Sequence, residues 1–390
     1  MFKKSLIAVA ALSALAGSAM AADVQIYGRI DTGFRYQNVD YDVAGVDDAS
    51  KFEMATGNYT GNRVGIKGSE DLGNGMTVGF VLENGFDSDD GSFDSNEDLF
   101  GREALLYLEG DFGKVGFGRM GILNSTAGSF AIGNFTPWGT GWGAVGDQSL
   151  IFGATFGSRW DNMISYRSPE FAGFQVHAQY SLGSSSADGT EVEGKTTTDR
   201  YYAIGATYKN GGLNLIGIVD SINEKHKART EDPDDTLRVT LGGSYDFGVV
   251  KPYVSAAYFK DAKMKTWLNS YTSGCQGTTA DAPDDWFSNY LNGDWDGYGV
   301  ILGGSAPLVG GTAHMTIGYM DAEEQNDAQN FGADLTRYTF AVGYEYPLSK
   351  RTKVYADAGY FKDEFDWGDK TVGDREPEGY QAAVGLVHYF

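Results

Sequence analysis

Cysteine, proline and basic residues are all scarce in this chain. A single cysteine, Cys275, stands among 390 residues, so no disulfide within the chain can hold an exported protein together. Only eight prolines occur, and most lie at positions expected to be turns or loops. The 30 Lys and Arg are outnumbered by 53 Asp and Glu, for a formal net charge of -23. A nucleic-acid partner is therefore not expected, because it would need a basic face.

Long apolar runs are also missing, apart from one near the N-terminus. Lys3 and Lys4 precede an apolar run over residues 6–15, and small residues end in Ala19-Met20-Ala21. This layout predicts a cleaved signal peptide over residues 1–21, which changes the formal charge from -23 to -23 - 2 = -25. No later run of about 18 apolar residues exists, so membrane-spanning helices are not expected. A β-barrel over residues 22–390 remains as the spanning option.

The residues that are abundant suit such a barrel. The chain has 24 Tyr, 23 Phe and 55 Gly. Aromatic side chains favour membrane interfaces, and glycine suits tilted strands and close backbone approach. At the C-terminus, every second position up to the last residue belongs to one face: Tyr380, Ala382, Val384, Leu386, His388 and Phe390. This period of two predicts a last strand, and its aromatic end is the expected signal to the barrel-assembly machinery.

Alternating segments joined by connections of two kinds recur through the chain. The first strand is predicted over Val24 to Tyr36, with Ile26, Ile30 and Phe34 on one face and Arg29, Asp31 and Arg35 on the other. Further strands are predicted over residues 202–208, 237–247, 250–258, 298–308 and 338–348. Short turns are predicted at residues 71–75, 110–113, 169–173, 209–212, 246–248, 307–311 and 347–350. Long connections are predicted over residues 38–60, 87–98, 121–157, 182–198, 223–235, 263–296, 321–334 and 362–378.

Seven turns and eight long connections predict sixteen strands, an even number as in bacterial barrels. The 369 residues left after 390 - 21 allow about 23 per strand, against roughly 9–11 needed to cross a bilayer. A solenoid or sandwich does not explain why every second connection is long. The pattern therefore predicts an all-β, antiparallel transmembrane barrel.

Five stretches resemble the general porins of Gram-negative outer membranes, most closely the neisserial and β-proteobacterial branch. They are DVQIYGRIDTGF (residues 23–34), NRVGIKGSEDLGNG (62–75), GDFGKVGFGRMG (110–121), SYRSPEFAGFQVHAQYS (165–181) and the ending VGLVHYF (384–390). The resemblance implies a 16-stranded barrel in the outer membrane with an inward-folded third extracellular loop. It also implies a homotrimer and passive diffusion of small hydrophilic solutes and ions.

In that family, wall arginines face acids on the inward loop and form the pore constriction. The matching positions here are Arg29, Arg63, Arg119, Arg159 and Arg167, and the only acid of residues 121–157 is Asp147. Period two independently points Arg29, Arg63, Arg159 and Arg167 into the lumen, whereas Arg119 shares its parity with Val115 and Phe117. Arg119 therefore needs a bulge or a strand end to turn inward, as the family pattern suggests. An arginine ring predicts mild anion preference. The alternative is that each arginine is a solvated or ion-paired wall residue.

The same loop is rich in aromatic side chains, including Trp138 and Trp142. Either these rings anchor the loop to the barrel, or the two tryptophans line the pore and stack on a flat solute. A substrate-specific channel for a sugar or an organic anion is accordingly the alternative function, and a surface adhesin is a further one.

Acidic residues concentrate in other long connections, such as residues 87–98, 231–235 and 363–369. They suit solubility at the cell surface, or divalent cations shared with lipopolysaccharide. The first of these segments resembles a calcium loop, but Gly91 comes one place early for that pattern, so no metal is assigned. No cofactor is expected. None of the histidines (His177, His226, His314, His388) lies in a hydrolase or zinc motif, so an enzyme is not expected either.

Overall fold

The computed structural model describes residues 23–42, 47–93, 98–153, 158–184, 192–224, 234–264, 267, 294–325, 332–367 and 374–390. The predicted signal peptide, Cys275, His226 and parts of the acidic connections lie outside these ranges. Among the described residues, no helix is long and apolar enough to cross a membrane.

Strands make up most of the described chain. They are β1 (Gln25–Asp40), β2 (Ala49–Thr56), β3 (Arg63–Gly73), β4 (Met76–Gly85), β5 (Glu103–Gly110), β6 (Gly113–Gly121), β7 (Arg159–Arg167), β8 (Phe174–Ser181), β9 (Arg200–Asn210), β10 (Leu213–Asn223), β11 (Thr236–Tyr245), β12 (Lys251–Ala262), β13 (Trp295–Leu308), β14 (Gly311–Glu324), β15 (Ala333–Pro347), β16 (Thr352–Trp367) and β17 (Glu378–Tyr389). Two short 3₁₀ turns, η2 (Gly143–Gly146) and η3 (Gln148–Leu150), lie between β6 and β7.

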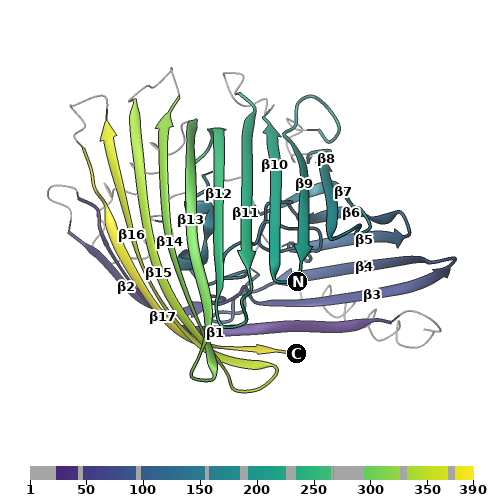
Figure 1. Ribbon diagram of the computed structural model, residues 1–390, viewed down its shortest axis with the longest axis horizontal. Coiled ribbons are helices and arrows are strands. Elements are labelled where there is room, and N and C mark those ends of the chain that lie inside the picture. Colours follow the sequence, from purple (N-terminus) through teal and green to yellow (C-terminus); the bar gives the residue numbers. More distant parts are fainter. Residues whose placement is uncertain are drawn as a thin grey trace.

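All strand pairs are antiparallel, and the sheet closes on itself. Sequential strands are hydrogen-bonded neighbours, and β9 to β16 can be followed side by side in Figure 1. The first and last strands pair from Arg29 with Tyr389 to Asp40 with Glu378. A closed sheet leaves no unpaired backbone edge for lipid, which is what a membrane requires.

Seventeen strand segments fill sixteen positions around the barrel. β2 and β3 both pair with β1: Thr56 lies opposite Thr32, and Arg63 lies opposite Arg29. Together they form one strand interrupted by residues 57–62. The prediction of a loop over residues 38–60 is thus wrong in part, because β1 continues to Asp40 and β2 lies inside that range. The sixteen-stranded barrel itself is confirmed.

The alternation of faces follows the prediction. On β1, Ile26 and Phe34 are exposed on the outer face, whereas Asp31 is fully buried on the inner face. The seven predicted turns lie between the strands of the seven close hairpins, and the eight long connections join strands at the other end. We call these the short-turn end and the long-loop end. Apolar side chains cover the outer wall while charged side chains gather inside.

Candidate functional site

The connection between β6 and β7 folds into the barrel. Its described part, residues 122–153, is called the inner loop below. The Trp138 indole N–H donates to the Thr316 hydroxyl of β14 at 2.8 Å, and Arg337 of β15 donates to the Leu150 carbonyl at 2.9 Å. Thr316 and Arg337 belong to the inner face of their strands, since both are buried while Ile317 and Tyr338 beside them are exposed. The inner loop therefore crosses the lumen to the far wall.

Glycines on the wall make room for the apolar side chains of the inner loop. A Cβ on Gly116 of β6 would lie 2.4 Å from the Phe130 ring, and one on Gly242 of β11 would lie 2.7 Å from Phe135. A Cβ on Gly343 of β15 would lie 2.6 Å from the Trp138 ring. Each is closer than carbon atoms can approach without a shift. The wall thus lacks side chains where the loop supplies rings, and this match holds the loop in place.

Trp138 and Trp142 belong to that anchoring and not to the pore surface. Only 3% and 2% of their surfaces are exposed. The two rings contact each other with centroids 5.3 Å apart, and Trp142 also packs on Tyr59 and Tyr355 at 4.7 and 5.8 Å. Of the two alternatives for these tryptophans, the structure therefore agrees with anchoring and not with pore lining, because their faces are covered by protein.

An arginine cluster forms on the wall beside β1 to β5. Arg29 and Arg63 lie directly opposite each other on β1 and β3. The Glu83 carboxylate of β4 forms ion pairs with Arg63 at 3.2 Å and with Arg102 at 2.9 Å. Arg29 contacts neutral groups: it donates to the Gly61 carbonyl at 3.3 Å and lies 5.9 Å from the Tyr389 ring centroid. Three guanidinium groups thus gather around one ion-paired carboxylate.

The interruption between β2 and β3 positions this cluster. Gly57 has a φ of +63°, which turns the backbone inward. The buried Asp31 carboxylate then accepts from the Thr60 N–H at 2.7 Å and from the Tyr355 hydroxyl at 2.8 Å. Held in this way, the Gly61 carbonyl also accepts from Arg63 at 3.1 Å. The irregular segment therefore orients two guanidinium groups.

Arg159 extends the cluster at the start of β7. It interacts electrostatically with both Arg63 and Glu103. The Glu103 carboxylate is occupied by the N–H and the hydroxyl of Ser129, at 2.6 and 2.8 Å. The structure thus brings Arg29, Arg63 and Arg159 together with Arg102.

Arg167 does not join them. It lies at the other end of β7, eight residues from Arg159, which corresponds to about 26 Å along a strand. There it lies opposite Lys114 and forms an ion pair with Glu109 at 3.7 Å. The expectation that Arg167 belongs to the constriction is wrong: it lines the short-turn end instead.

Arg119 does not turn inward either. The expected bulge exists, but its extra residue lies on β7, since Gly118 pairs with Met163 and Met120 pairs with Trp160. The alternation of β6 therefore stays unbroken, and Arg119 keeps the parity of the exposed Phe117 while Met120 is buried. Its guanidinium donates to Asp161 at 2.6 Å and to the Gly101 carbonyl at 2.7 Å. The alternation of inward and outward residues along β6 therefore predicts the orientation of Arg119 correctly, and the family pattern does not.

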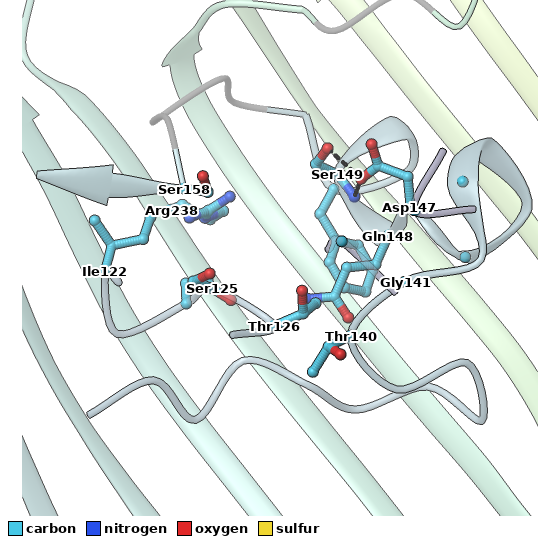
Figure 2. A pocket seen from close by; sticks show the side chains of 16 residues that line it. Ile122, Ser125, Thr126, Thr140, Gly141, Asp147, Gln148, Ser149, Ser158 and Arg238 are labelled. Atoms are coloured by element: carbon cyan, nitrogen blue, oxygen red, sulfur yellow. Dashed lines mark hydrogen bonds between the residues drawn. The ribbon is translucent and has the colours of Figure 1, made fainter. Parts of the chain in front are cut away.

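Asp147 lines a cavity of about 520 Å³ beside the inner loop. Its carboxylate accepts from the N–H and the hydroxyl of Ser149, at 3.0 and 2.5 Å. Figure 2 shows Asp147 and Ser149 on one side of this cavity and Arg238 of β11 on the other. Gly61, next to the arginine cluster, is also part of the lining. The cavity therefore adjoins both the cluster and the acid of the loop.

Several wall charges were missed by the sequence reasoning. Arg238 forms a two-fold ion pair with Asp220, at 3.1 and 2.7 Å, and Arg337 does the same with Asp363, at 2.6 and 2.7 Å. The signal was available, because a charged residue between apolar neighbours of a strand points inward. Arg102 offered no such signal, as it precedes β5. The inward acids Glu83 and Glu103 also reduce the positive excess that was expected from the arginines alone.

The C-terminal residues complete the wall. Tyr380, Leu386 and Phe390 are exposed on the outer face, and the His388 ring lies 2.9 Å from the Thr352 hydroxyl. The N–H of Phe390 donates to the Gly28 carbonyl, and the N–H of Gly28 donates to the Phe390 carbonyl, both at 3.1 Å. The last residue thus takes part in the closure of the barrel.

Comparisons with known proteins agree with this architecture. A family model described as Gram-negative porin matches residues 8–366. An outer membrane porin protein of Bordetella pertussis is 35% identical over 382 residues, which cover 92% of this chain and 94% of the relative. The major outer membrane protein P.IB of Neisseria lactamica is 29% identical and covers 100% of both chains. Among solved structures, an anion-selective porin from Comamonas acidovorans superposes with a TM-score of 0.60 at 26% identity, over 95% of this chain and 100% of that one.

A closed barrel with a polar lumen and full-length similarity to outer-membrane porins leads to one conclusion. The chain belongs to the Gram-negative porin family and forms a channel, not an enzyme, in the outer membrane.

Proposed function

We propose that this porin passes small hydrophilic solutes by passive diffusion with a mild preference for anions at its narrowest section. The observation that carries the preference is the cluster of Arg29, Arg63, Arg102 and Arg159 around Glu83 and Glu103. The buried Asp31 carboxylate also lies near Arg29. Among the described residues, four cations against these three carboxylates give a local formal charge of 4 - 3 = +1. Rings of arginine favour anion passage.

The total charge of -23 does not contradict this preference. Many of the acids belong to connections at the long-loop end, and salt screens charges beyond about 8–10 Å. The solved anion-selective porin from Comamonas acidovorans, at 26% identity, also supports the proposal.

General diffusion is favoured over a channel for one flat solute. The exposed aromatic surface that such a solute would need is absent at Trp138 and Trp142, which are buried. In this proposal, Asp147 is the acidic side chain of the inner loop, and it faces the basic wall residue Arg238 across the 520 Å³ cavity.

Reversal potentials in a salt gradient across a planar bilayer test the anion preference. In the double variant Arg63→Ser, Arg102→Ser the local formal charge of the described cluster falls from +1 to 2 - 3 = -1, so the preference for chloride over potassium should disappear. Arg351→Ser is the matched control, because Arg351 is exposed in the turn before β16. A wild-type channel that prefers potassium, or a double variant with unchanged selectivity, would refute the proposal.

We also infer a homotrimer, as is typical of the family, with lipid and lipopolysaccharide around its outer wall and with the C-terminal residues read by the assembly machinery. Apolar stacking continues over the outer faces of β1 and β2, where the Phe34 and Phe52 rings lie 5.8 Å apart. Native mass spectrometry of the protein released from detergent tests the trimer, and a monomer as the main species would contradict it.

A further inference from the structure

A second cavity, of about 460 Å³, lies between the inner loop and strands β9 to β12. Its volume falls in the range of ordinary small-molecule pockets. It is lined by residues 131, 132, 134–137 and 139 of the inner loop on one side and by wall residues near the short-turn end on the other. It shares no lining residue with the 520 Å³ cavity described above.

A row of polar side chains forms the wall of this cavity. Lys209 of β9 lies directly opposite Asn214 of β10, Asn214 opposite Ser244 of β11, and Ser244 opposite Tyr253 of β12. Since neighbouring strands lie about 4.8 Å apart, the row spans about 14 Å. All four residues have the inward parity of their strands and line the cavity.

A second lysine, Lys251, stands beside the end of this row. Its ammonium lies 5.1 Å from the ring centroid of Tyr253. Within the described part of the chain, neither Lys209 nor Lys251 has a carboxylate within ion-pair distance, in contrast to Lys114, which pairs with Glu109 at 3.4 Å. Two positive charges thus face one cavity without a protein counter-ion among the described residues.

The inner loop contributes polar atoms that also lack partners. The Thr136 side chain is 95% buried, since its exposure is 5%, and its hydroxyl has no hydrogen-bond partner among the described residues. The buried Asn134 amide oxygen has none either. Both atoms are closed off from solvent, so they belong to the wall behind the cavity and offer no hydrogen bond to a solute. Phe135 and Ile216 also line the cavity and give it apolar surface.

We propose that this cavity is a binding subsite for small organic acids at the short-turn end of the channel. The carboxylate lies between Lys209 and Lys251 and accepts hydrogen bonds from Asn214 and Ser244. The apolar body of the acid contacts Phe135 and Ile216. The subsite deepens the proposed anion preference and rests on it, because the acid must reach the cavity through the channel. It adds recognition of the organic part of the anion, which a ring of arginines alone does not supply.

Inhibition of chloride current by benzoate tests this proposal on the full channel in a planar bilayer. Acetate serves as the charge-matched anion without an aromatic body, and benzamide as the uncharged ring. We expect benzoate to reduce the current at lower concentration than either. In Lys209→Gln, Lys251→Gln the half-blocking concentration of benzoate should rise about tenfold, as for the loss of a charged hydrogen bond.

Lys67→Gln is the matched control. Lys67 also has inward parity and its ammonium lies 5.2 Å from the Tyr27 ring centroid, but it does not line the cavity. Equal inhibition by benzoate and acetate, or equal effects of the control and the double variant, would overturn the subsite. The reversal potential measured on the same channels separates the two proposals. If only the subsite proposal is wrong, the unmodified channel still prefers chloride over potassium. If the arginine proposal is wrong, the unmodified channel shows no preference for chloride.

Discussion

The buried ion pair between Arg337 and Asp363 allows a quantitative test of how the inner loop is held. Both side chains are completely buried, and they lie directly opposite each other on β15 and β16. Arg337 makes two charged hydrogen bonds to Asp363 and a third to the Leu150 carbonyl of the inner loop. Arg337→Met removes all three and leaves a buried carboxylate without its cation. Such a loss costs about 3–5 kcal/mol.

Removal of both charges should cost much less. In Arg337→Met, Asp363→Leu no charge among the described residues loses its partner, and the main loss there is the bond to Leu150, worth about 1 kcal/mol. We expect the double variant to be about 2–4 kcal/mol more stable than the single one. Urea unfolding of refolded protein in detergent, followed by tryptophan fluorescence, measures the difference. A double variant no more stable than Arg337→Met would refute the assignment of the cost to the unpaired carboxylate.

Two further predictions concern the wall. Gly343→Ala places a Cβ 2.6 Å from the Trp138 ring, so it should destabilise the barrel by about 1–3 kcal/mol. The control Gly304→Ala should not, because the nearest atom to its Cβ is 4.0 Å away. Equal melting temperatures of the two variants would contradict the packing argument. Deletion of Phe390 removes two backbone hydrogen bonds to Gly28, so it should lower the yield of refolded barrel, measured by the mobility shift between heated and unheated samples on a gel. The control Phe390→Leu keeps both bonds. Refolding of the deletion variant at the wild-type level would contradict a role of Phe390 in closure.

Features of the chain that depend on near neighbours were predictable. Alternation along β1 placed Arg29 and Asp31 inside and Ile30 outside, and glycine with asparagine or aspartate marked the turn between β3 and β4. The same local rule applied to Arg119 and would have placed it correctly. The family pattern predicts an inward Arg119 instead, but the bulge that this requires lies on the neighbouring strand.

Contacts between distant residues were not predictable from one sequence. The Tyr355 hydroxyl reaches Asp31 across 324 positions, and Arg337 reaches Leu150 across 187. Likewise, the distance that separates Arg167 from Arg159 follows from strand length, which places two inward arginines of one strand at opposite ends. Burial of Trp138 depends on the missing side chain at Gly343, a match that only the folded wall reveals.

Closure through β1 and β17 has a consequence for how the protein is made. The two strands that close the barrel are the first and the last of its strands to be synthesised. A nascent chain that lacks β17 therefore has two strand edges with unpaired amide and carbonyl groups. Such a piece has no stable place in lipid, where unmet backbone groups are costly. Insertion into the membrane must therefore wait until all strands are synthesised, or it needs a chaperone that covers both strand edges until β1 and β17 pair.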